Sequence, residues 1–483
     1  MQTKQKILTG SLTVLFAVVA LMGIRGFSFH ANSPTKNVII MISDGCGYHH
    51  IDAASLFQYG RTGDQVYEHF PVKLAMSTYS LLGQGYDPQQ AWASPGYVQQ
   101  WFTDSAAAAT AMATGTKTNN GELGMDPNQR RLKNLMEYAQ EKGYATGVVT
   151  TVEFSDATPA AFAAHNASRA NWEEIAQEMI LRSKLDVIMG AGNPGFDDNG
   201  RPLSNLDQCD AHCKKYFYTT VGGEQVWKGL LAGALGNDMD GDQIPDRWEL
   251  IQTRSEFQNL AHGPAPRRVI GIAQVPITLQ QTRSGNGHAL PYAAPLNRDL
   301  PTLAEMSLAA LNVLHHDSHG LVVMIEGGAI DRAAHLNQTG RMIEEEIDFN
   351  RAVEAVAAWV EENSNWDETL LVVTADHETG YLVGPGAFPA IALRGKGQGE
   401  MPDLKWQSDD HTNQLVPLFA QGRAARLFQD YATQTDPVRG AYLDNTAIFH
   451  VVLTALAINP DQDLISQLCA HAEKTDSATV HCE

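Results

Sequence analysis

The sequence predicts an α/β protein whose central sheet is mostly parallel and has helices on both faces. Three observations support this prediction. Apolar, β-branched runs recur along the chain, they alternate with helix-like segments, and several of them end in acidic residues. A continuous apolar run indicates a strand buried on both faces, and such strands are typical of parallel sheets covered by helices.

The expected elements follow the chain in a regular order. Strand-like runs occupy residues 37–42, 144–151, 185–192, 320–328 and 369–377, and helix-like segments occupy residues 132–143, 303–314 and 342–362. Gly143 is expected to end the first of these helices. The alternation of strand-like and helix-like segments is interrupted at about 197–297 and again at about 384–410. We interpret both stretches as irregular insertions in a single domain at 32–483.

Composition indicates a globular protein and excludes broad binding to nucleic-acid backbones. The chain has 483 residues, of which 43% are hydrophobic and 18% are charged. Its formal net charge is −21. Proteins that bind nucleic-acid backbones need a basic surface, so we expect no nucleic-acid partner. A local basic pocket for a small anion is compatible with this charge.

The N-terminus is expected to direct export to the periplasm or the extracellular space. A basic start, MQTKQK, precedes an apolar run at 7–24. That run is longer than the 7–15 residues of most signal peptides and reaches the lower limit of a membrane span. Residues 1–31 therefore form either a signal peptide cleaved after Ala31 or an uncleaved membrane anchor.

The cysteines fit an oxidising compartment. We expect local disulfides Cys209–Cys213 and Cys469–Cys482, with Cys46 left as a free thiol. Other pairings stay open, because sequence does not fix connectivity.

Acidic residues gather where the expected strands end. Asp44, Glu326 and Asp376 each follow an apolar run, and His377 comes next to the last of these. Ligands of parallel sheets bind beyond the carboxyl ends of the strands. Carboxylates collected there would repel one another without cations, so the pattern indicates a metal site.

Further metal-ligand candidates lie near these strand ends. Asp331 and His335 are four residues apart and would share one face of a helix. His411 stands in a DDHT segment. Histidine combined with carboxylate suits zinc, whereas carboxylate and hydroxyl oxygens suit magnesium.

The segment FTDSAAAATAMATG places one serine at the start of an alanine-rich helix. Alanine has the best helix propensity, and free backbone N–H groups at a helix start attract anions. Asp104 and Ser105 could be ordinary helix caps. Ser105 is also in position to act on a bound anion.

Six ordered motifs resemble those of the alkaline phosphatases. They are MISDGCGYHH, TDSAAAATAMATGTKTNNGELGMD, EFSDATPAAFAAHNASR, MIEGGAIDRAAH, TADHETG and DDHT. The resemblance extends over about residues 37–449. It implies an exported phosphoric monoester hydrolase (EC 3.1.3.1) that is often homodimeric.

The resemblance also implies a role for each site residue. Ser105 would be the nucleophile that forms a phosphoserine, and Arg169 would bind two phosphate oxygens. Two zinc ions and one magnesium ion would be bound. One zinc would be held by Asp331, His335 and His411, the other by Asp44, Asp376 and His377, and magnesium by Asp44, Thr158, Glu326 and, through water, Asp156.

Arg332 departs from the family pattern. Bacterial relatives often carry lysine at this position, and others carry histidine or tryptophan. A fixed positive charge beside Asp331 is expected to contact phosphate and to slow its release.

The first insertion contains an acidic loop, DMDGDQIPDRWE. Its acidic residues have the spacing of EF-hand calcium ligands, although glycine stands at position 4 and glutamine at position 6. We expect either a structural calcium site or an acidic surface turn. The candidate ligands are Asp238, Asp240, Asp242, Asp246 and Glu249.

Two other functions remain open from the sequence. The chain could be a phosphodiesterase or sulfatase of the same superfamily, although Arg169 and the magnesium site favour a dianionic monoester. It could also be a calcium-stabilised binding protein that has lost catalysis, although the full ligand set argues against this.

Overall fold

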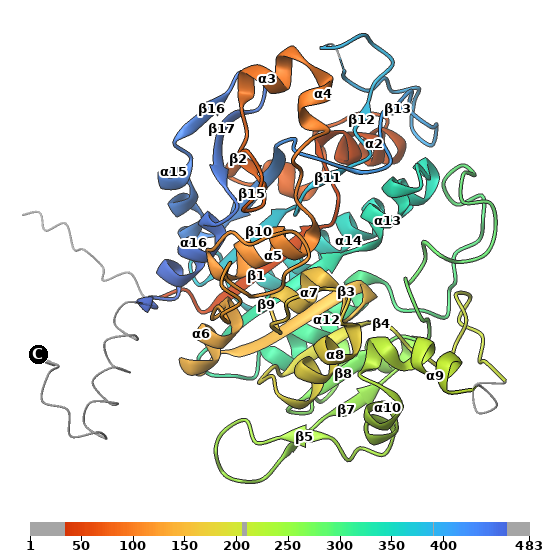
Figure 1. Ribbon diagram of the computed structural model, residues 1–483, viewed down its shortest axis with the longest axis vertical. Coiled ribbons are helices and arrows are strands. Elements are labelled where there is room, and N and C mark those ends of the chain that lie inside the picture. Colours follow the sequence, from red (N-terminus) through yellow and green to blue (C-terminus); the bar gives the residue numbers. More distant parts are fainter. Residues whose placement is uncertain (1–33, 205–209, 390, 461–483) are drawn as a thin grey trace, which may run out of the picture. The chain divides into compact units, whose positions relative to one another are not determined.

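The computed structural model describes residues 34–204, 210–389 and 391–460 (Figure 1). The described residues from Thr35 onward form one compact unit. The expected targeting segment at 1–31 and the cysteine pair Cys469–Cys482 lie outside the described residues, as do Cys209 and the side chain of Cys213. Cys46 is buried and forms no disulfide, as expected.

An 11-stranded sheet forms the centre of the fold, in the order β16-β17-β2-β15-β10-β1-β9-β3-β4-β8-β7. The seven strands from β10 to β7 are mutually parallel, whereas β15 runs antiparallel to both of its neighbours. The strand bounds are β1 Asn37–Ser43, β2 Val72–Ser77, β3 Ala145–Glu153, β4 Val187–Ala191, β7 Glu249–Ile251, β8 Val269–Ile272, β9 Leu321–Gly327, β10 Thr369–Thr374, β15 Val416–Gln421, β16 Gln434–Asp436 and β17 Gly440–Asp444. The predicted α/β class with a mostly parallel sheet is confirmed.

Helices cover both faces of this sheet (Figure 1). All residues of β1, β3, β9 and β10 are buried, as the continuous apolar runs predicted. Helices α12 and α14 pack together on β3 and β9, and α5, α6, α7 and α16 form a second connected group. The longer helices are α2 Tyr48–Tyr59, α5 Ser105–Thr114, α6 Leu135–Glu141, α8 Trp172–Leu181, α9 Ala211–Tyr218, α10 Glu224–Leu231, α11 Arg254–His262, α12 Leu303–Leu314, α13 Ala329–His335, α14 Thr339–Asn363 and α16 Ala447–Ala455.

Short elements complete the fold. Three two-stranded sheets pair β5 Gly236–Asn237 with β6 Asp246–Arg247, β11 Glu378–Thr379 with β14 His411–Thr412, and β12 Leu382–Val383 with β13 Lys405–Trp406. The short helices are η1 Val66–His69, α3 Pro88–Ala93, α4 Pro95–Val98, α7 Ala157–Ala161, η3 Thr219–Val221, η4 Arg423–Leu427 and α15 Phe428–Tyr431. Within the described residues, no helix has the length and apolarity needed to cross a membrane.

The first insertion is less irregular than its sequence predicts. The segment 197–297 contributes β7 and β8 to the edge of the main sheet, where both run parallel to β4. These strands have only three and four residues. Strands this short do not give a recognisable apolar pattern. The sequence therefore did not predict that the alternation of strands and helices continues through this segment.

His165 links the segment after α7 to α6 and α8, and it gives a pH-dependent prediction. Burial opposes its protonation, but contacts with Glu137 and Glu178 raise its pKa to about 9. Because the pKa is raised on folding, the stabilisation is complete below about pH 6.5 and is lost as pH rises through 9. We expect His165→Gln to lower the free energy of unfolding by about 1–3 kcal/mol at pH 6 and by clearly less at pH 10.

Urea unfolding of both proteins at the two pH values measures this difference. His288→Gln, at an exposed position, is the control. A deficit of the same size at pH 6 and pH 10 would show that His165 acts through packing and not through its charge.

Candidate metal and phosphate site

The acidic strand ends meet at one edge of the sheet. Neighbouring strands β10, β1, β9 and β3 are parallel, so their carboxyl ends lie side by side. Asp376 follows β10, Asp44 follows β1, Glu326 is the second-last residue of β9, and Glu153 is the last residue of β3. The structure thus brings together Asp44, Glu326 and Asp376, which the sequence singled out, and adds Glu153, which it did not.

The three residues expected at the first zinc ion converge. His335 Nε2 lies 2.9 Å from His411 Nε2 and 3.3 Å from Asp331 Oδ2. His411 Nε2 also lies 3.5 Å from Asp331 Oδ1. Helix α13 carries Asp331 and His335 on one face, and His411 comes from β14.

The residues expected at the second zinc ion also form a group. Asp44, Asp376 and His377 offer ligand atoms within 4.8 Å of one another. His377 Nε2 is 3.6 Å from Asp44 Oδ1 and 3.2 Å from Asp376 Oδ2. The rings of His377 and His411 stack at 3.6 Å, so the two groups are adjacent.

Backbone carbonyls orient two of the histidines. His411 Nδ1 lies 2.8 Å from the carbonyl oxygen of Thr103, and His335 Nδ1 lies 2.7 Å from that of Asp409. A carbonyl accepts a hydrogen bond, so the proton belongs on Nδ1 and Nε2 keeps a free lone pair. This is the usual way in which a protein prepares a histidine as a metal ligand.

Glu326 and Thr158, expected at magnesium, lie beside Asp44 and Asp156. Burial raises the pKa of Glu326 to about 8, while a hydrogen bond from the Thr150 hydroxyl to Glu326 Oε2 favours its charged form. The hydroxyl oxygen of Thr158 is buried and forms no hydrogen bond with any described residue. The group consists of oxygen ligands, which suits magnesium.

The donor atoms fit bound cations. Asp44 Oδ1 and Asp376 Oδ2 are buried and form no hydrogen bond with any described residue. Burial and the neighbouring carboxylates raise the pKa of Asp44 well above its ordinary value and that of Asp376 to about 6. Burial and two neighbouring histidines lower the pKa of His377, which keeps it neutral as a ligand must be. Bound cations would neutralise the carboxylates and use these free lone pairs.

Ser105 is the first residue of α5 and faces the second zinc group. Asp104 caps the helix by accepting a hydrogen bond from the backbone N–H of Ala107. Ser105 Oγ lies 3.2 Å from His377 Nε2, and the residue is 4% exposed. Ser105 is therefore beside the candidate metal ligands, where its expected role places it.

Arg169 is held by two carboxylates at the edge of the site. Its Nη1 donates to Asp104 Oδ2 at 3.2 Å, and its Nη2 donates to Asp156 Oδ1 at 3.1 Å. Asp104 is the residue before Ser105, so the arginine is tied to the start of the same helix. A guanidinium presented in this way can bind phosphate oxygens with its remaining N–H groups.

Arg332 contacts carboxylates, one of which the sequence analysis missed. Its Nη2 donates to Glu153 Oε2 at 2.6 Å and to Asp156 Oδ2 at 2.7 Å. Burial opposes ionisation of Asp156, but Arg332 and Arg169 hold its pKa below the ordinary value. Thr379 is another residue that was missed, and its hydroxyl donates to Asp331 Oδ1 at 2.5 Å.

The acidic loop is only partly assembled as a cation site. Asp238, Asp240 and Asp246 approach within 4.8 Å, whereas Asp242 and Glu249 are not part of that group. Asp242 accepts a hydrogen bond from a backbone N–H in its own turn, and Glu249 starts β7. The guanidinium of Arg267 contacts both Asp240 and Asp246, at 2.9 and 2.7 Å, and partly neutralises them.

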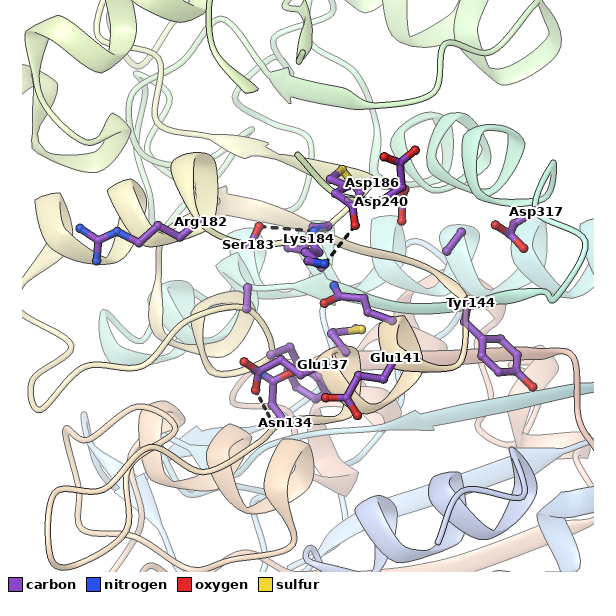
Figure 2. Close-up of a pocket in the computed structure, with 18 of the residues that line it drawn as sticks. Asn134, Glu137, Glu141, Tyr144, Arg182, Ser183, Lys184, Asp186, Asp240 and Asp317 are labelled. Carbon is purple, nitrogen blue, oxygen red and sulfur yellow. Dashed lines mark hydrogen bonds between the residues drawn. The ribbon is translucent and has the colours of Figure 1, made fainter. Parts of the chain in front are cut away.

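A large cavity lies elsewhere. Its volume is about 660 Å³, and it lies at the amino ends of β3 and β4, with Tyr144, Lys184 and Asp186 among its lining residues (Figure 2). The candidate site lies at the carboxyl ends of these parallel strands. Ser105 and the zinc and magnesium candidates do not line the cavity, so it is separate from the chemistry proposed below.

Relatives of this chain are alkaline phosphatases. The chain is 31% identical over 355 residues to alkaline phosphatase 3 of Bacillus subtilis, covering 72% of this chain and 62% of that protein. It is 29% identical over 441 residues to alkaline phosphatase of Escherichia coli, covering 84% and 85% of the two chains. The chain therefore spans less than two thirds of the Bacillus relative and most of the Escherichia one.

Solved structures share the fold. Alkaline phosphatase from the Antarctic bacterium TAB5 matches with a TM-score of 0.60 and 24% identity, covering 88% of this chain and 100% of that chain. Alkaline phosphatase from a psychrophilic Shewanella matches with a TM-score of 0.61 and 24% identity, covering 87% and 99%. The family model for alkaline phosphatase matches residues 35–394, so this chain belongs to the alkaline phosphatase family.

Proposed function

We propose that this protein hydrolyses phosphate monoesters through a phosphoserine at Ser105, in a site that binds two zinc ions and one magnesium ion. The observation that carries the proposal is the position of Ser105 Oγ, 3.2 Å from His377 Nε2 and beside two groups of convergent metal-ligand atoms. Family membership supports the same activity.

Each metal is assigned to residues whose donor atoms suit it. Zinc would be held by Asp331, His335 and His411 and by Asp44, Asp376 and His377, and magnesium by Asp44, Thr158, Glu326 and, through water, Asp156. Structures of TAB5 variants contain magnesium in a site named M3, which supports a magnesium site in the family. When bound, the metals would stabilise negative charge on the attacking and leaving oxygens.

Each site residue has a separate role in the two steps of the reaction. Arg169 binds two phosphate oxygens and fixes the phosphorus in front of Ser105. Ser105 Oγ attacks phosphorus, the bond to the ester oxygen breaks, and the alcohol leaves with a proton. Water then attacks the phosphoserine, which releases inorganic phosphate and restores the serine hydroxyl. Asp104 caps α5 and accepts a hydrogen bond from Arg169, so it fixes the position of Arg169 relative to Ser105.

A comparison of substrates tests this proposal. We expect purified protein that starts at Asn32 to hydrolyse p-nitrophenyl phosphate much faster than bis(p-nitrophenyl) phosphate between pH 7 and 10. A diester preference would favour the phosphodiesterase alternative. Folded, zinc-loaded protein without either activity would favour the binding-protein alternative.

We also propose that calcium stabilises the acidic loop at 238–249. Calcium must compete with Arg267 for Asp240 and Asp246. We expect 1 mM calcium to raise the thermal midpoint of the zinc- and magnesium-loaded protein, and to raise it more in Arg267→Ala, because binding to the folded state stabilises it by mass action. Differential scanning fluorimetry measures the shifts, with Asp238→Asn as control. Equal midpoints with and without calcium in both proteins would indicate an acidic surface turn.

Export and dimer formation are further proposals. Residues 1–31 would direct the chain to the periplasm or the extracellular space, as a cleaved signal or as a membrane tether. Cell fractionation combined with N-terminal sequencing separates the two. Light scattering of the purified protein tests the proposed homodimer.

A further inference from the structure

Glu153 holds one nitrogen of the Arg332 guanidinium inside the site. It is the last residue of β3 and is 7% exposed. Its Oε2 and Asp156 Oδ2 both accept hydrogen bonds from Arg332 Nη2. A guanidinium Nη2 carries two N–H groups, so these two carboxylates use both of them. This nitrogen therefore has no N–H group left for a phosphate oxygen.

Arg169 differs from Arg332 in this respect. Arg169 makes one carboxylate contact through each of its two terminal nitrogens. Each of those nitrogens keeps one N–H group for a ligand. Arg169 is therefore open to phosphate, whereas Arg332 can reach phosphate with its Nη2 only by giving up a carboxylate.

We propose that Glu153 is a positioning residue that competes with phosphate for Arg332 and thereby limits how tightly the site retains inorganic phosphate. The inference rests on the proposed phosphatase function. Asp156 cannot play this part alone, because it is shared with Arg169. Glu153 forms an ion pair with Arg332 and none with Arg169, so it acts on only one of the two arginines.

Phosphate affinity of the zinc- and magnesium-loaded protein tests the competition. Isothermal titration calorimetry with inorganic phosphate gives the dissociation constant, and inhibition of p-nitrophenyl phosphate hydrolysis gives a second value. We expect Glu153→Gln to bind phosphate roughly three- to tenfold more tightly, since a contact between charged partners is replaced by a weaker one. Its KM is expected to fall with the dissociation constant.

Two companion variants separate contact from charge. Glu153→Asp keeps the charge but shortens the side chain, so it is expected to tighten phosphate binding as well. Arg332→Ala is expected to bind phosphate less tightly than the parent, and adding Glu153→Gln to it should produce no tightening. The Asp variant and the Arg332 pair decide the question even if Glu153→Gln does not fold.

Three results would overturn the inference. Weaker phosphate binding in Glu153→Gln would show that Glu153 supports the site and does not compete with phosphate. Tightening that persists in the Arg332→Ala background would show a general effect of charge. Unchanged affinity in all variants of a phosphate-binding parent would show no role. A parent that neither binds phosphate nor hydrolyses the monoester would instead refute the proposed function itself.

Discussion

Replacing Ser105 by alanine is expected to lower monoester hydrolysis by at least about a thousandfold, since loss of a catalytic nucleophile removes the covalent route. The side chain is small and lies at the first position of α5, where alanine is a good helix former. The fold and the metal ligands should therefore be preserved. Steady-state kinetics with p-nitrophenyl phosphate measures the loss, and metal analysis checks that zinc and magnesium remain.

Ser307→Ala is the matched control for this experiment. Ser307 is also buried in a helix, where its hydroxyl donates to the backbone carbonyl of Leu303 at 2.7 Å. We expect this variant to retain nearly full activity. If Ser105→Ala remained within tenfold of the parent, the phosphoserine route would be wrong and direct attack by water would replace it.

Removal of the metals is expected to abolish activity and to lower stability in a pH-dependent way. Burial and mutual repulsion raise the pKa of Asp376 to about 6, and burial raises that of Glu326 to about 8. In metal-free protein, acids with raised pKa stabilise the fold only while protonated, so stability falls as pH rises from about 4 through 8. Bound cations remove this penalty. The thermal midpoints of loaded and EDTA-treated protein should therefore differ more at pH 9 than at pH 6.

Scanning calorimetry at both pH values measures the midpoints. Restoring zinc and magnesium after EDTA treatment is the control, and it should recover both activity and midpoint. Loaded and EDTA-treated protein with the same midpoint at pH 9 would contradict a metal site among these carboxylates.

The strands and the acidic residues at their ends could be predicted because the pattern that encodes them lies in consecutive residues of the sequence. Continuous apolar runs precede Asp44, Glu326 and Asp376. Both the burial of these strands and the polar residues that end them can therefore be predicted from the sequence. Strand β3 also ends in an acidic residue, Glu153, but its sequence ATGVVTTVE contains three threonines and a glycine and is not a continuous apolar run. The strand expected from the sequence therefore ended at residue 151, before Glu153.

Other parts of the site depend on tertiary contacts that no sequence pattern reports. The carbonyl groups of Thr103 and Asp409 orient His411 and His335, yet backbone carbonyls carry no residue-specific signal. Arg267 lies far along the chain from the acidic loop that it partly neutralises. Spacing identified candidate ligands, but only the fold shows which basic side chain competes for them.

Two pairs of short strands close the base of the irregular segment at 384–410. The β12–β13 pair joins its ends, and the β11–β14 pair beneath it carries His411 and the threonine that contacts Asp331. Thr379 and His411 therefore lie on the other side of this closure from the loop tip. Ile391 packs against Tyr381 and Val383, whereas residues 394–400 are exposed, and we expect this tip to tolerate changes in length without moving Thr379 and His411. Insertions, deletions or grafted sequences placed there would reshape the protein's surface while leaving the chemistry intact, which makes this loop a natural place for new specificities to be engineered or to evolve.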